Sequence, residues 1–88
     1  MEKRIGSVLI LIEEKSSVSE LNSIISEHGS IIIGRQGLPV QSSSNGLISL
    51  VLEGNTDQIA SLTGQLGRLE GVSAKSIVFK LKNKNETN

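Results

Sequence analysis

The chain has 88 residues, enough for one small domain, and it lacks cysteine, which excludes disulfides, thiolate metal sites and cysteine nucleophiles. Nine basic residues balance nine acidic ones, and this balance excludes a strong electrostatic attraction to nucleic acid or to an anionic membrane. A single phenylalanine is the only aromatic residue, so the stacking of bases on rings is excluded too, and no apolar run approaches the ~20 residues that span a bilayer.

The first predicted element is a strand over residues 5–12, which is apolar almost throughout. Because successive side chains of a strand point to opposite faces, this strand carries apolar groups on both. One face has Val8, Ile10 and Ile12, and the other has Leu9 and Leu11. A strand of this kind is predicted to be central in its sheet and covered on both sides.

A helix is predicted next, because apolar residues recur at helical spacing. Ser17 and Glu20 have the spacing of a capping box, so we expect the helix to start at Ser17. Gly29 is expected to end it in the left-handed conformation. The apolar stripe consists of Val18, Leu21, Ile24, Ile25 and His28.

Two further strands are predicted over about residues 30–40 and over residues 46–54. The segment between them, "QSSSNG", ends in Asn45-Gly46, a pair suited to positive φ in a hairpin. The second of these strands is again largely apolar on both faces. Ile48, Leu50 and Leu52 share one face, and Leu47, Ser49 and Val51 share the other.

A second helix is predicted from Asn55, which with Gln58 repeats the capping pattern, and its stripe contains Ile59, Leu62 and Leu66. Glycine inside a helix costs about 1 kcal/mol relative to alanine, so Gly64 suggests close packing at that point. Gly67 or Gly71 is expected to close the helix. The last predicted strand, "VSAKSIVFKL", has Ile77, Phe79 and Leu81 on one face.

The order strand-helix-strand, strand-helix-strand predicts an α+β fold of the ferredoxin-like type, a βαββαβ sandwich. We expect a four-stranded antiparallel sheet in the order 4-1-3-2 with both helices on one face. This order puts the two strands that are apolar on both sides in the middle. Residues 1–80 are predicted to form the single domain, and residues 81–88, polar and rich in lysine, a disordered tail.

Two helices cover only one face of such a sheet, so four apolar side chains are expected on the uncovered one: Leu9, Leu11, Leu47 and Val51. Exposed apolar patches usually mark a partner surface. We therefore predict self-association through the uncovered face, through an edge strand, or through both. The alternative is a monomer with some exposed leucines.

Catalytic residues are not recognisable in the sequence, and we expect no enzyme activity, cofactor or metal. The single histidine, His28, has no partner at helical spacing and suits a helix C-terminus. Glu13 and Glu14 are adjacent carboxylates at a strand end, where solvation is the usual state. No Ser/His/Asp set and no phosphate-binding glycine loop is visible.

The run "GRQGLP" is the most unusual local feature, because Gly34 and Gly37 interrupt a strand that ends at Pro39. One interpretation is a bulged edge strand that blocks uncontrolled pairing, with Arg35 as a solubilising charge. The other is a kinked edge that places Arg35 and free backbone groups at a groove between subunits, able to hold a carboxylate or a partner backbone. The two interpretations are compatible.

Three segments carry a family resemblance: "GRQGLPV", "ISLVLEG" and "LTGQLGRLEGVSAK". In this order and spacing the chain, from Arg4 to about Lys80, resembles the candidate iron-only hydrogenase system regulators. The resemblance implies an ACT-like, oligomeric regulatory domain, related in fold to the C-terminal domain of nickel-responsive repressors. It implies no known ligand.

Two properties of related domains do not carry over residue by residue. The metal site of nickel-responsive repressors uses several histidines and a cysteine. This chain has one histidine and no cysteine. Amino-acid-binding ACT domains have a glycine at the first strand-to-helix turn, and here that turn reads "EEKSS".

No helix-turn-helix or ribbon-helix-helix segment is visible, so direct nucleic-acid binding is not expected.

The sequence thus predicts a cytoplasmic, non-enzymatic regulatory module that forms a dimer or tetramer and acts through a small-molecule ligand or a regulatory protein. A ligand is expected at a subunit interface near Gly34, Arg35, Gly37 and Pro39. The alternative is a structural scaffold that oligomerises without a ligand. A third, remote hypothesis is a DNA-binding corepressor that uses the lysine-rich tail.

Overall fold

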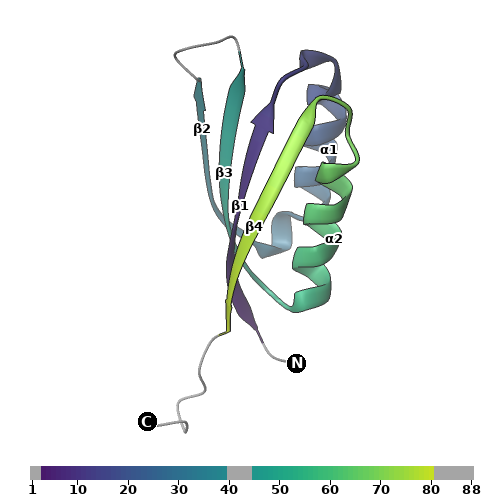
Figure 1. Cartoon of the computed structure of the whole chain (residues 1–88). Coiled ribbons are helices and arrows are strands. Elements are labelled where there is room, and N and C mark those ends of the chain that lie inside the picture. The colour runs from purple at the N-terminus through teal and green to yellow at the C-terminus, as the bar shows by residue number, and fades with distance from the viewer. Residues whose placement is uncertain (1–2, 40–44, 81–88) are drawn as a thin grey trace, which may run out of the picture.

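The computed structural model describes residues 3–39 and 45–80. Its elements are β1 (Arg4–Ile12), α1 (Val18–Glu27), β2 (Ile32–Pro39), β3 (Gly46–Gly54), α2 (Thr56–Gly67) and β4 (Val72–Lys80). The strands form one antiparallel sheet in the order β2-β3-β1-β4, and both helices lie on the same side of it (Figure 1). This is the predicted ferredoxin-like α+β fold, with β1 and β3 in the middle of the sheet.

The core lies between the sheet and the two helices. The side chains of Val8, Ile10, Leu50 and Leu52 point to the helices and are fully buried. From the helical side the core is completed by Leu21, Ile25, Ile59, Leu62 and Leu66. Full burial of one such side chain stabilises a fold by about 1.5–3 kcal/mol, so this aliphatic layer is the main stabilising contribution. The predicted division of β1 and β3 into two faces is confirmed.

The start of β2 differs from the prediction. The chain forms a 3₁₀ turn (η2, Gly29–Ile31) before β2 begins at Ile32, because Ile31 is buried in the core instead of extending the strand. Pairing with β3 then shifts register between Ile32 and Gly34, which makes the edge strand irregular. This bulge agrees with the interpretation of "GRQGLP" as a bulged edge.

The predicted left-handed Gly29 is wrong, since Gly71 is the only glycine with positive φ among the described residues. His28 caps the C-terminus of α1, and its backbone N–H donates to the carbonyls of Ile24 and Ile25 at 3.2 and 3.1 Å. The His28 carbonyl accepts from Ile31 N–H at 3.1 Å. These bonds satisfy the helix end without a left-handed residue.

The predicted capping box at Ser17 is also wrong. A 3₁₀ turn (η1, Lys15–Ser17) precedes α1, and the Ser17 side chain makes no cap bond to the helix. Its buried hydroxyl instead donates to the backbone carbonyl of Glu70, at 2.7 Å. A tertiary hydrogen bond has therefore replaced the local one that the spacing predicted.

The capping box of α2 is confirmed in both directions. Gln58 N–H donates to Asn55 Oδ1 at 2.8 Å, and Asn55 N–H donates to Gln58 Oε1 at 2.9 Å. Gly67 is the last residue of the helix. The close packing predicted at Gly64 is wrong, because a Cβ built there has no neighbouring atom within 4 Å.

The prediction for the β2–β3 connection is confirmed in part. The two strands form an antiparallel pair that ends at Pro39 and Gly46. Gly46 does not have positive φ, so the conformation predicted for this glycine is wrong. Residues 40–44 and the predicted tail 81–88, which includes Leu81, lie outside the described residues.

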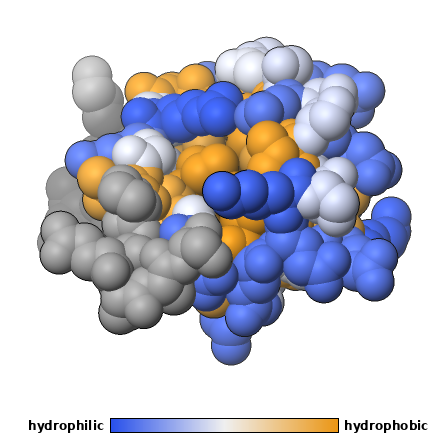
Figure 2. Space-filling view, turned by 90° about the horizontal axis from the view of Figure 1, so that it is seen from above, coloured by the Kyte–Doolittle hydropathy of each residue, from blue (hydrophilic) through white to orange (hydrophobic). Residues whose placement is uncertain are grey.

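The two strand–helix units are tied together at the end of the molecule where β1 finishes and β4 begins. Glu13 and Glu14 donate their backbone N–H groups to the carbonyl of Gly71, at 2.7 and 3.3 Å. Gly71 has φ +74°, and a Cβ added to it would overlap the side chain of Glu14. Viewed from above, this end shows apolar surface bordered by hydrophilic side chains (Figure 2).

Replacement of Gly71 by alanine is expected to lower the free energy of unfolding by about 1–3 kcal/mol, because the left-handed backbone and the Glu14 contact both oppose a Cβ. Gly64→Ala is the matched control, and it should raise the free energy of unfolding by about 0.5–1 kcal/mol, because the added methyl meets open space in a helix. Urea denaturation at one protein concentration measures both. Equal effects of the two substitutions would contradict this description.

Candidate functional site

The face of the sheet opposite the helices carries most of the exposed apolar surface of the described residues; we call it the open face. It is formed by alternate residues of the four strands, since residues paired in an antiparallel sheet share a face. Five of its side chains are between 41% and 65% exposed: Leu9, Leu38, Val51, Ile77 and Phe79. A set of exposed apolar side chains on one face is a candidate contact surface.

The strand register joins these side chains into rows across the sheet. Leu38 is paired with Leu47, and Leu47 with Leu11, which gives an apolar row over three strands. At the opposite end of the sheet Ile5 is paired with Phe79. Adjacent cross-strand side chains lie about 4.5–5.5 Å apart, so the apolar groups within each row lie next to one another.

All four residues predicted for the uncovered face lie on the open face: Leu9, Leu11, Leu47 and Val51. Four further residues of the open face are absent from the predicted set: Ile5, Leu38, Ile77 and Phe79. In β4, Val72, Ala74 and Val78 lie on the helical side, and the positions between them lie on the open face. The pattern of β4 alone does not show which of these two faces is covered by the helices. That assignment requires the pairing of β4 with β1.

Two charged residues of opposite sign also lie on the open face. Lys75 is paired with Leu9, and Glu53 is paired with Ile5. Lys75 is exposed and Glu53 is partly buried. The open face is therefore apolar with one cation on an edge strand and one anion on a central strand.

The four residues predicted for a ligand site lie along the β2 edge, but on both sides of it. Arg35 lies on the helical side, where its Nη2 donates to Oδ1 of Asn22 in α1 at 3.1 Å. Gly34 is paired with Val51 on the open face. A Cβ at Gly37 would meet no atom within 4 Å, and Pro39 is paired with Gly46 at the strand end.

His28 sits between the two helices. Its Nδ1 is 2.7 Å from the carbonyl oxygen of Ile24, and its Nε2 is 3.3 Å from Oγ of Ser61 in α2. Glu13 and Glu14 are exposed at the end of β1. Within residues 3–39 and 45–80, His, Asp and Glu side chains form no group of three that could hold a metal ion.

A four-stranded antiparallel sheet, two helices on one side and an apolar face on the other define a ferredoxin-like α+β module. The chain belongs to the TM1266-like family, described as a candidate iron-only hydrogenase system regulator, whose family model matches residues 4–76. The family resemblance inferred from the three sequence segments is thereby confirmed. No curated protein matches the chain. No helix in the described part of the chain is long and apolar enough to cross a membrane.

Solved structures agree with this assignment. Uncharacterized protein TM1266 from Thermotoga maritima is 30% identical and superimposes with a TM-score of 0.83, over 90% of this chain and 100% of that one. The C-terminal domain of MgtC from Mycobacterium tuberculosis is 13% identical, with a TM-score of 0.68 over 92% of this chain and 93% of that domain. CPII from Thiomonas intermedia K12, bound to ADP, AMP and acetate, is 9% identical, with a TM-score of 0.53 over 94% of each chain. The last two similarities concern the fold alone.

Replacement of Arg35 by alanine is expected to change the free energy of unfolding by less than about 0.5 kcal/mol. The reason is that its hydrogen bond to Asn22 is exposed, and exposed side-chain interactions contribute little to stability. Urea denaturation measures the change. A loss above about 2 kcal/mol would mean that Arg35 is needed for the fold and is not a surface residue available for binding.

Proposed function

We propose that the protein is a non-enzymatic regulatory module of an iron-only hydrogenase system and that it works as a homo-oligomer. Its family membership supports the regulatory part of this proposal. The observation that carries the oligomeric part is the open face, where apolar side chains of all four strands are exposed together. Burial of a large aliphatic or aromatic side chain contributes about 1.5–3 kcal/mol, so covering this surface is a substantial driving force.

A second copy of the chain is the partner that this surface fits best. In a twofold pair the same patch is used by both subunits, so an apolar face meets an apolar face. The charged positions fit the same arrangement, because a contact between Lys75 of one subunit and Glu53 of the other occurs twice in a twofold pair. Face-to-face packing of two sheets is also a common way of burying such surfaces.

The β2 edge is the place where a small ligand would bind in this oligomer. Gly34 lies on the open face and Arg35 lies on the other side of the same edge, next to Gly37 and close to Pro39. The edge therefore borders the proposed contact between subunits. A guanidinium group at that border suits a ligand with a carboxylate or phosphate group.

The alternative function is a scaffold that oligomerises without a ligand. A thermal-shift screen of anionic metabolites separates the two, because a ligand that binds the native state raises the melting temperature. A shift seen with the wild type and lost in Arg35→Ala supports the ligand site at the β2 edge. An unchanged shift in that variant rejects the site, and no shift with any compound favours the scaffold.

The wild type is expected to sediment as a dimer or tetramer at about 20 µM, an ordinary affinity range for protein interfaces. The double variant Leu9→Glu, Phe79→Glu should sediment as a monomer, because association would then bury unpaired carboxylates. Ser23→Glu, on an exposed position of α1, is the control and should keep the wild-type mass. A wild-type monomer at this concentration rejects the oligomeric part of the proposal.

Charge reversal tests how the two copies meet. Lys75→Glu and Glu53→Lys, each alone, should weaken association by about tenfold or more, because each places like charges opposite one another. The double variant, with both charges exchanged, should recover most of the lost affinity. The measurement is the dissociation constant from sedimentation at several protein concentrations. A double variant as weak as the two single effects combined would rule out the Lys75–Glu53 contact.

A further inference from the structure

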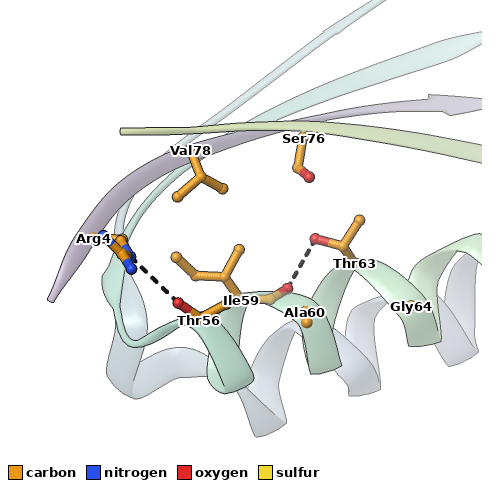
Figure 3. Close-up of a pocket in the computed structure, with 8 residues that line it drawn as sticks. All are labelled: Arg4, Thr56, Ile59, Ala60, Thr63, Gly64, Ser76 and Val78. Atoms are coloured by element: carbon orange, nitrogen blue, oxygen red, sulfur yellow. Dashed lines mark hydrogen bonds between the residues drawn. The ribbon is translucent and has the colours of Figure 1, made fainter. Parts of the chain in front are cut away.

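A groove of about 470 Å³ lies on the helical side of the molecule, between α2 and β4. It is separate from the open face and from the β2 edge, since β4 is the opposite edge of the sheet. In Figure 3 the side chains of Ser76 and Val78 point from β4 toward α2, and Arg4 of β1 stands at one end. A volume of this size is within the range of small-molecule sites.

The groove exists because small residues line it where larger ones would close it. Gly64 and Ala60 supply almost no side chain on the α2 side. Gly64 is unfavourable in a helix, and no packing contact compensates for it, because nothing lies within 4 Å of the position of its Cβ. Because Gly64 has no side chain, it leaves the groove open at this position.

The groove has an apolar middle and polar ends. Ile59 of α2 and Val78 of β4 face each other across its middle (Figure 3). Arg4 is held at one end by a hydrogen bond from its Nε to Oγ1 of Thr56, at 3.3 Å. At the other end the hydroxyl of Thr63 donates to the carbonyl of Ile59 at 2.9 Å, which leaves its oxygen lone pairs as acceptors.

The charge of the residues that line the groove favours a negatively charged ligand. Among the described residues that line the groove, Arg4 is the one charged residue and none is a carboxylate. A guanidinium at the end of an apolar space favours an anion that also has an apolar body. Carboxylates are the planar anions that the donor geometry of arginine matches.

We propose that this groove binds a small aliphatic monocarboxylate. Its carboxylate would contact the guanidinium of Arg4, and its apolar body would cover Ile59 and Val78 in the direction of Thr63. The site is contained in one subunit, so the proposal goes beyond the proposed function and does not depend on the oligomeric state. Failure of one therefore leaves the other standing.

Sodium hexanoate is the probe, and titration into the ¹⁵N-labelled full chain is followed by amide chemical shifts. Saturable shifts are expected in α2 and β4, centred on residues 59–64 and 76–78. The uncharged 1-hexanol should bind at least about tenfold more weakly, because it lacks the charge-assisted bonds to Arg4. No saturable shift, shifts confined to the open face, or equal binding of the alcohol would each overturn the proposal.

Two variants locate the site. Gly64→Leu should abolish binding by filling the groove, while Gly67→Leu in the same helix is the matched control and should bind as the wild type does. Gly67 also has open space around it and does not line the groove. Arg4→Met keeps an apolar chain and should weaken hexanoate binding by about tenfold or more. If Arg4→Met fails to fold, the two leucine variants still decide, and unchanged binding in Gly64→Leu rejects the site.

Discussion

The geometry of this protein depends on the burial of one face of a four-stranded sheet by two helices. β1 and β3 are apolar on both sides, but the two helices can cover only one of them. Val8, Ile10, Leu50 and Leu52 obtain full burial from the helices. The residues between them in sequence, such as Leu9 and Val51, are not covered by another element of the described chain. The open face is thus a direct consequence of having strong central strands and only two helices.

The two helices are held over the sheet by different means. α2 starts with a local capping box between Asn55 and Gln58, which the sequence spacing encodes. α1 is held by long-range contacts: Ser17 bonds to the carbonyl of Glu70, and the Gly71 carbonyl accepts from the chain that leaves β1. These bonds join the two halves of the molecule at one end.

The two edges of the sheet have different characters. The β2 edge is irregular, with a register shift after Ile32, and it carries Arg35 against α1. Such an irregular edge resists the addition of another strand. The β4 edge is regular, and the groove lies under it on the helical side. The open face joins these two edges, so a partner on that face leaves the groove on the far side of the sheet.

The amino-acid sequence by itself determined the elements, the order of the strands and the division of β1 and β3 into two faces. The elements and the two faces follow from periodicity, which is a local property: side chains alternate with period two in a strand and recur every 3.6 residues in a helix. The strand order follows from the order of these elements along the chain, because connections are short and crossovers are right-handed. The same periodicity placed Leu9, Leu11, Leu47 and Val51 on the open face, because both strands are central.

Only the tertiary structure decided the features that join distant residues. The pairing of Ile5 with Phe79, which extends the open face, depends on strand register. The partner of Ser17 is 53 positions away, and a capping motif cannot reveal it. Gly64 suggested close packing, yet it borders open space, because the distance between α2 and β4 is set by the whole core. Sequence patterns describe what each segment prefers, while the contacts between segments decide which preference is satisfied.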